Sequence, residues 1–97
     1  MPAVARKGDQ ERGPKHCTQP KRQGAFATVF ANGIPMSGFG HTNNNHLKRK
    51  GSKCVVHRFG LITASFTVFA EGIRTGRVGD RTRCSKVVRG SNNVFAG

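Results

Sequence analysis

One segment of the sequence occurs twice and then begins a third time. Residues 28–41 read Thr-Val-Phe-Ala-Asn-Gly-Ile-Pro-Met-Ser-Gly-Phe-Gly-His, and residues 67–80 repeat this frame without a gap at an offset of 39. The end of the chain, residues 91–97, begins the frame again, while residues 5–9 resemble its second half. Three repeats, one of them divided between the two termini, predict a closed arrangement with threefold pseudo-symmetry and adjacent chain ends.

Each repeat alternates with the period of two that is typical of a strand. Val and Ala fall on one face of the Val-Phe-Ala segment and Phe falls on the other. Asn32-Gly33 and Glu71-Gly72 follow where a tight hairpin turn needs residues that tolerate a positive φ. No window has the spacing and capping of an amphipathic helix. We therefore predict an all-β fold of short antiparallel strands and hairpins, with residues 1–97 as a single domain.

The composition implies that a hydrophobic core alone does not hold this chain together. Only 35% of the residues are apolar, and 17 Lys and Arg against 4 Asp and Glu give a formal charge of +13. A chain this short leaves a small margin after the entropy cost of ordering it. No apolar run is long enough for a membrane span, and the first residues lack the layout of a secretory signal, so we expect synthesis in the cytosol. Three Cys, an odd number, argue against a disulfide framework and favour a metal site.

The candidate ligands lie in the loops that follow the repeats. His16, His57 and Cys84 precede the next Val-Phe pair by 13, 11 and 10 residues, which suggests equivalent positions. A fourth ligand would come from the longer insertion of the second repeat, where we favour His46 and His41 is the alternative. His41 stands where the other repeats have Asp, so we interpret it as a turn residue. Imidazole and thiolate groups in a closed tetrahedron are typical of structural zinc, although they also suit iron or copper.

These residues together resemble a known family, the PAAR-repeat spike-tip proteins of contractile phage tails and type VI secretion systems. The resemblance rests on residues 2–9, the two Val-Phe-Ala-x-Gly-Ile frames, residues 77–80 and the closing residues 90–97, and so it extends over nearly the whole chain. It is strongest to the single-domain form of T4-like phage tails. The chain departs from the family pattern at residues 36–39 and at His41, where the family has Pro-Ala-Ala-Arg-like residues and Asp.

The resemblance implies a small conical PAAR-type fold that binds zinc, with iron as the alternative, near its apex through three His and one Cys. It also implies a structural, non-catalytic function. One chain would cap a trimeric β-helical spike in the virion, after synthesis in the host cytoplasm, and would pierce the target cell envelope when the tail contracts. We expect the base contact to be made by the Val-Phe pairs of the three repeats, although alternation alone does not decide which face is internal. These residues are Val29, Phe30, Val68, Phe69, Val94 and Phe95.

The charge supports a second hypothesis, a small basic nucleic-acid-binding protein of ribosomal type. A +13 chain attracts phosphate groups, and Lys48-Arg49-Lys50 form a basic run that would also suit anionic lipid. Against nucleic acid, the Phe residues lie inside the repeats and are not interleaved with the basic residues. An enzyme is disfavoured, because Cys54 and His57 have no recognisable orienting group or oxyanion motif beside them.

Overall fold

Short antiparallel strand pairs make up the regular structure of the computed structural model, which describes residues 1–14 and 16–97. No helix occurs among these residues, so the predicted all-β class is confirmed. The strands form four two-stranded sheets, β1 with β8, β2 with β3, β4 with β5 and β6 with β7. Their bounds are β1 Glu11–Arg12, β2 Phe30–Ala31, β3 Ile34–Pro35, β4 His46–Lys50, β5 Lys53–His57, β6 Phe69–Ala70, β7 Ile73–Arg74 and β8 Lys86–Val87.

The two internal repeats form the hairpins that their turn residues predict. Asn32 and Gly33 have φ values of 57° and 75°, and Glu71 and Gly72 have values of 52° and 77°. Two successive residues with positive φ are the signature of a type I′ turn, whose twist matches that of the flanking strands. The β2–β3 and β6–β7 hairpins are therefore copies of one another in backbone conformation as well as in sequence.

The three repeats meet in a closed triangle of backbone hydrogen bonds, which we call the central triangle. The amide of Ala5 donates to the carbonyl of Gly76 at 2.8 Å, Gly76 donates to Ser37 at 2.9 Å, and Ser37 donates back to Ala5 at 2.9 Å. All three residues are small and buried, because three chain segments approach one another at this point. A Cβ atom at Gly76 would lie only 3.0 Å from the Ser37 carbonyl oxygen. The split repeat thus completes the threefold arrangement that the sequence predicts.

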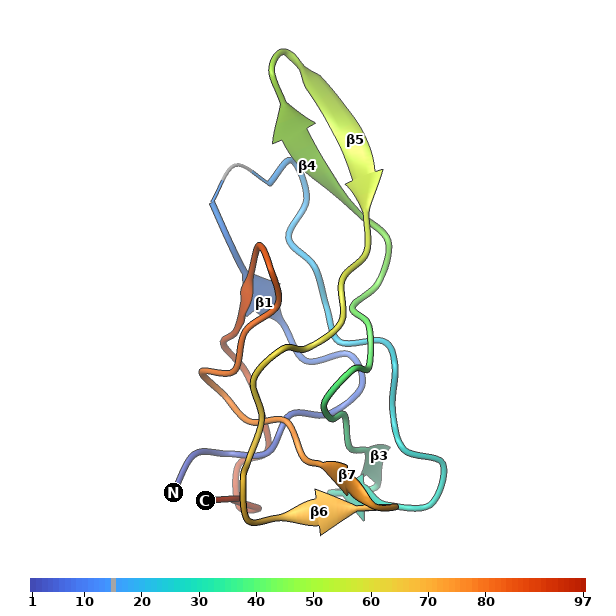
Figure 1. Ribbon diagram of the computed structural model, residues 1–97, viewed down its shortest axis with the longest axis vertical. Helices are drawn as coiled ribbons and strands as arrows, with labels where there is room; N and C mark the ends of the chain where they lie inside the picture. Colours follow the sequence, from blue (N-terminus) through green and yellow to red (C-terminus); the bar gives the residue numbers. More distant parts are fainter. Residues whose placement is uncertain (15) are drawn as a thin grey trace.

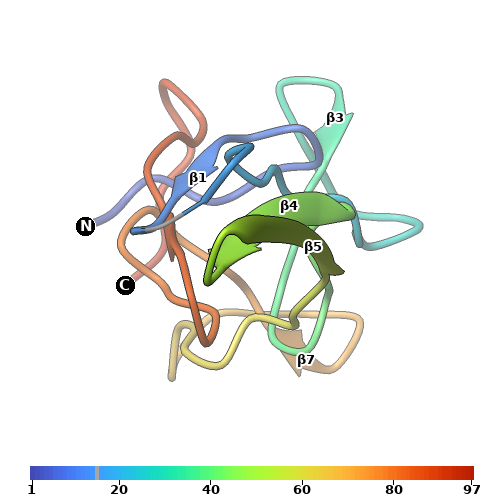
Figure 2. The same ribbon diagram turned by 90° about the horizontal axis from the view of Figure 1, so that it is seen from above.

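The molecule is elongated, with extents of 41 × 23 × 21 Å. The β2–β3 and β6–β7 hairpins and both termini lie at one end, the base, and the β4–β5 hairpin forms the other end, the apex (Figure 1). Seen along this axis, β3, β7 and the paired termini lie on three sides of the centre (Figure 2). Near the termini, Val4 donates from its amide to the carbonyl of Val94 at 3.0 Å.

Two small apolar clusters fill the base and the level above it. The first includes one buried Ala from each repeat, and its members are Val4, Phe26, Ala31, Met36, Ala70 and Ala96. The second contains Ala5, Leu61 and Val87. Above them the interior becomes polar, and neither cluster reaches the apex. Interactions other than apolar packing must therefore hold the apical half.

Candidate metal centre

The β4–β5 hairpin, which is an insertion in the second repeat, positions two of the candidate ligands. His46 begins β4 and His57 ends β5, and their Cα atoms are partners in the antiparallel register. The Gly51-Ser52 turn closes this hairpin at its far end, where Gly51 has a φ of 63°. Two further candidates approach the open end of the hairpin from other loops. His16 forms a β-bridge with Lys48, and Cys84 lies in the turn before β8.

Three side chains form a cluster that could hold a metal ion. The ligand atoms of His16, His46 and Cys84 all lie within 4.8 Å of one another. The thiol Sγ of Cys84 is 3.9 Å from Nε2 of His46, and the imidazole centroids of His16 and His46 are 4.9 Å apart. These residues come from three separate segments of the chain, so an ion bound here would join all three.

A backbone contact orients His46 for ligation. Its Nδ1 lies 2.9 Å from the carbonyl oxygen of Asn44, and only a protonated Nδ1 can donate a hydrogen bond there. The proton on Nδ1 leaves a lone pair on Nε2, the nitrogen that faces Cys84. Metal-binding His residues are typically held in this way by a hydrogen bond from the other ring nitrogen. His46 is also only 3% exposed, which limits alternative orientations of the ring.

His16 fits a ligand role for a different reason. Both of its ring nitrogens are buried and have no hydrogen-bond partner among the described residues. A buried polar atom without a partner costs free energy, which a bound ion would offset. Gly13 gives the ring its space, because a Cβ atom there would meet the Cys84 carbonyl oxygen and would lie 2.5 Å from Cε1 of His16.

His57, the remaining predicted ligand, lies beside this cluster and outside its 4.8 Å limit. Its ring centroid is 6.3 Å from that of His46, and its Nδ1 is buried without a partner among the described residues. Desolvation lowers the pKa of His57, and the positive charge of Lys48 lowers it further. The ring is therefore held in its neutral form, in which it can act as a ligand.

His41 lies at a turn, away from the three clustered ligands. Its Nδ1 accepts a hydrogen bond of 2.9 Å from the amide of Gly38. The carboxylates of Asp9 and Asp80 accept the equivalent bonds from the amides of Arg6 and Arg77. His41 thus has the role that Asp has in the other two repeats.

The argument against a disulfide is wrong. Cys17 and Cys54 form one, with Cα atoms 6.2 Å apart and 37 residues between them in sequence. An odd number of Cys excludes complete pairing, and it does not exclude a single bond that leaves one thiol free, which here is Cys84. The bond joins the residue that follows His16 to β5. It therefore restrains two of the chain segments that surround the cluster.

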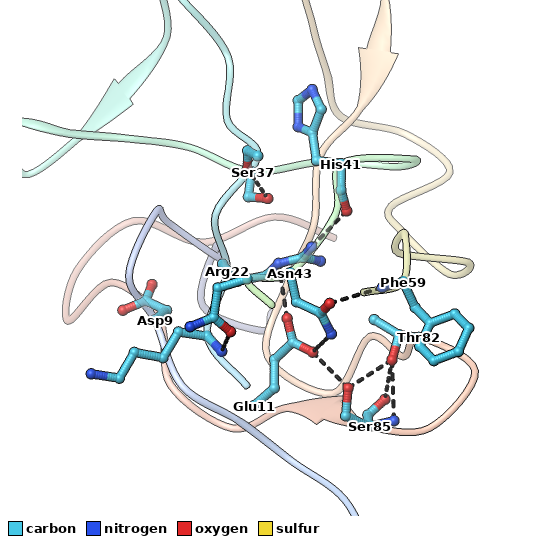
Figure 3. Close-up of polar contacts among 12 residues, drawn as sticks. Asp9, Glu11, Arg22, Ser37, His41, Asn43, Phe59, Thr82 and Ser85 are labelled. Carbon is cyan, nitrogen blue, oxygen red and sulfur yellow. Dashed lines mark hydrogen bonds and ion pairs between the residues drawn. The ribbon is translucent and has the colours of Figure 1, made fainter. Parts of the chain in front are cut away.

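A buried polar network around Glu11 and Arg22 was not predicted (Figure 3). The Glu11 carboxylate and the Arg22 guanidinium form an ion pair at 3.0 Å, and both side chains are 0% exposed. Glu11 also accepts hydrogen bonds from Asn43 at 3.1 Å and from Ser85 at 2.6 Å. Burial lowers the pKa of Arg22, and the opposite charge of Glu11 counteracts this effect. Ser85 directly follows Cys84 in the chain and donates a hydrogen bond to Glu11. The network is therefore linked through the backbone to the cluster of candidate metal ligands.

The predicted base residues divide between surface and core. Phe30, Phe69 and Phe95 are 54%, 56% and 48% exposed. Val29 and Val94 are half-buried and pack against the basal apolar cluster, whereas Val68 is exposed. The base therefore presents one Phe from each repeat to the solvent.

Comparisons with known proteins identify no relative. No protein-family model matches the chain, and a search of curated proteins finds no significant match. Among the described residues, no helix has the length and apolar character that a bilayer span requires.

Proposed function

We propose that this chain is a PAAR-type spike tip, a structural protein that caps a trimeric β-helical spike in a contractile phage tail. The central triangle is the observation that carries the proposal. A single chain has three different sides, and it can match the end of a true trimer only if its backbone repeats around an axis. The bonds among Ala5, Ser37 and Gly76 supply such an axis.

The exposed Phe residues at the base support the same function. Phe30, Phe69 and Phe95 occupy equivalent positions in the three repeats, and each is about half exposed. Apolar side chains arranged around the pseudo-threefold axis suit the end of a trimeric β-helix, where unpaired strand edges need to be covered. One chain per trimer is the stoichiometry that this arrangement predicts.

The proposed function is mechanical, and a metal would stiffen the apex. We assign the site to zinc, because its donors are imidazole nitrogens and a thiolate and a closed set of such ligands is typical of structural zinc. His16, His46 and Cys84 would hold the ion, with His57 as the fourth ligand. A bound ion would link separate loops and add its binding free energy to that of folding. In this function the tip is carried in the virion and enters the target envelope first.

Complex formation with trimeric β-helical spikes tests the capping function. Native mass spectrometry of the chain mixed with a panel of contractile-tail spikes is expected to find one chain per trimer. The triple variant Phe30→Asp, Phe69→Asp and Phe95→Asp should lose the complex, because a charge would be buried at each contact. Phe66→Asp is the matched control, since Phe66 is 78% exposed but lies outside the Val-Phe-Ala frames. Equal binding by both variants, or no complex with any spike, would contradict the proposal.

Elemental analysis of the untagged protein tests the metal. We expect about one zinc ion per chain, as in closed structural sites. His46→Ala and Cys84→Ser should lose the ion, and His57→Ala should weaken its retention. His41→Asp is the control that keeps the ion, because the His41 ring accepts its hydrogen bond from Gly38 in its own turn and is not part of the cluster. Retention of zinc by the His46 and Cys84 variants would exclude the site.

A further inference from the structure

The charges of this protein are unevenly neutralised. Each of the 4 acidic side chains is already engaged within the molecule. Their partners are Arg6 for Asp9, Arg22 for Glu11, Arg77 for Asp80 and Thr28 for Glu71. No acidic side chain pairs with the basic residues of the β4–β5 hairpin. The apex therefore carries a concentrated positive charge that the protein itself does not balance.

Part of this charge surrounds a cavity of about 430 Å³ beside the metal cluster. Three of its lining residues are cationic, Lys48 from β4 and Arg81 and Arg83 from the turn before β8. Ile62 and Pro14 contribute an apolar wall. Among the described residues no Asp or Glu lines the cavity, so its net charge is positive and attracts an anion.

The backbone that carries these cations is held in place. The amide of Arg81 donates to Thr63 Oγ1 at 2.9 Å, and Lys48 is paired with Val55 across the hairpin. Between the two arginines, Thr82 accepts a bond of 3.1 Å from the Ser85 amide and closes the turn. Preorganised cations lose less conformational entropy on binding than cations on a mobile loop.

We propose that this cavity binds the phosphate group of an anionic membrane lipid. Guanidinium groups bind phosphate oxygens in a bidentate manner, and a Lys ammonium adds a compact charge. The apolar surroundings favour a phosphate that is attached to a lipid. Ile62, which lines the cavity, is 51% exposed. No aromatic side chain lines the cavity, and bases of nucleic acids would need such a platform for stacking. This inference goes beyond the spike-tip function and stands without it.

Cosedimentation with vesicles tests the proposal. Vesicles of phosphatidylcholine containing phosphatidic acid should bind the protein, and vesicles of phosphatidylcholine alone should not. The triple variant Lys48→Gln, Arg81→Gln and Arg83→Gln should reduce the partition coefficient by roughly 100-fold, at about 1 kcal/mol per basic residue near an anionic surface. Inorganic phosphate should compete weakly, because it supplies the charge without the apolar contact.

A second triple variant separates the cavity from general charge. Lys7→Gln, Lys21→Gln and Arg89→Gln remove the same charge from exposed residues that do not line the cavity. This control should bind within about threefold of the parent protein at 0.1 M salt, because the three residues do not line the cavity and exposed charges are screened by salt. Zinc content and circular dichroism of both variants verify the fold.

Three results would overturn the inference. The first is an equal loss in both triple variants, which would mean that only net charge matters. The second is binding of inorganic phosphate as tightly as of phosphatidic acid vesicles, which would mean that the lipid contributes nothing. The third is tighter binding to a single-stranded oligonucleotide than to vesicles, lost in the cavity variant. That third result would assign the cavity to nucleic acid.

Discussion

The base and the apex of this protein are stabilised by different means. At the base, the same interactions occur three times around an axis, and the central triangle and three equivalent β-bridges link each repeat to the next. These bridges pair Arg6 with Met36, Gly38 with Thr75, and Val4 with Arg77. At the apex nothing is repeated, and one hairpin, one disulfide and one candidate metal cluster hold the chain.

The comparison indicates what a small repeat fold can do without a large core. Where three segments converge at the base, backbone hydrogen bonds and the packing of small side chains are sufficient to hold the segments together. Where the molecule narrows to one hairpin, too few residues remain to bury apolar surface, and crosslinks take over this role. We therefore expect a substitution at the apex to destabilise only the apex. A substitution between the two regions should destabilise both the apex and the base.

The largest effect is expected from the buried ion pair between the two regions. Glu11→Ala leaves the Arg22 guanidinium buried without a counter-charge, and the free energy of unfolding should fall by about 3–5 kcal/mol. Guanidinium denaturation followed by circular dichroism measures this loss. Amides of the base and of the apex should lose protection from hydrogen exchange together, because Glu11 bonds to Ser85 and Asn43 as well.

A double variant is the control for the ion pair. Glu11→Leu with Arg22→Met removes both charges and should lose less stability than Glu11→Ala. If the single variant were as stable as the parent protein, the two regions would not depend on this pair.

The next largest effect is expected from loss of the disulfide. Cys17→Ser with Cys54→Ser should cost about 3–4 kcal/mol, the loop-closure value for the 37-residue separation. Hydrogen exchange should resolve where the loss occurs. The amides of Cys17 and Thr18, which both donate to the Leu47 carbonyl, should lose more protection than those of the central triangle. Equal loss in both places would contradict the separation of apex and base.

A smaller effect, on the pH dependence of stability, is expected from His41, which stands where the other two repeats have Asp. Burial and the nearby charge of Arg22 lower the pKa of His41, and Glu71 partly opposes this. Below its usual value of 6.5 the unfolded chain therefore binds more protons at this site than the folded protein. The contribution of neutral His41 to the free energy of unfolding should be fully present above about pH 6.5. It should be lost progressively as the pH falls toward the lowered pKa of the folded protein. In His41→Asp this contribution should disappear.

Thermal unfolding of both proteins between pH 7.5 and about pH 5 measures this difference. Comparison with His41→Asp is needed, because the chain contains three other His residues. If the melting temperatures of the two proteins decreased in parallel with falling pH, His41 would make no pH-dependent contribution to stability.

The smallest effect concerns a single contact at the base. Glu71 accepts hydrogen bonds from the Thr28 amide at 2.8 Å and the Thr28 hydroxyl at 2.6 Å, and these bonds lower the pKa of Glu71. Glu71→Gln should therefore lower the melting temperature slightly at pH 7. The difference should vanish as the pH falls through the lowered pKa, where the parent carboxylate is protonated too. A constant difference at low pH would mean that the charge is not responsible.

The base could be predicted from sequence because its signals are local and repeated. The Asn32-Gly33 and Glu71-Gly72 turns and the alternation around Phe30 and Phe69 specify hairpins without tertiary information. The repeat offset then relates one hairpin to the other. The resemblance of residues 5–9 to residues 76–80 predicts how the ends complete the arrangement.

The apex could be predicted only in part. Loop position brought His16, His46 and Cys84 into consideration, and these side chains do cluster. The Cys17–Cys54 bond joins residues 37 apart, and no local pattern specifies that pairing. Glu11 and Arg22 stand in segments of ordinary polar sequence, and only the tertiary fold buries them. The Gly51-Ser52 turn was the available signal for the β4–β5 hairpin.

The divided repeat also has a consequence for the time course of folding. Ala5 bonds to Gly76, which lies 71 residues further along the chain, and its neighbour Val4 bonds to Val94. The central triangle therefore cannot close until these distant segments have met. Contacts between residues so distant in sequence are slow to form, since the entropy of closing the intervening loop must be overcome first. We therefore expect the base to form late in folding, whereas the β4–β5 hairpin, whose contacts are local, is free to form earlier.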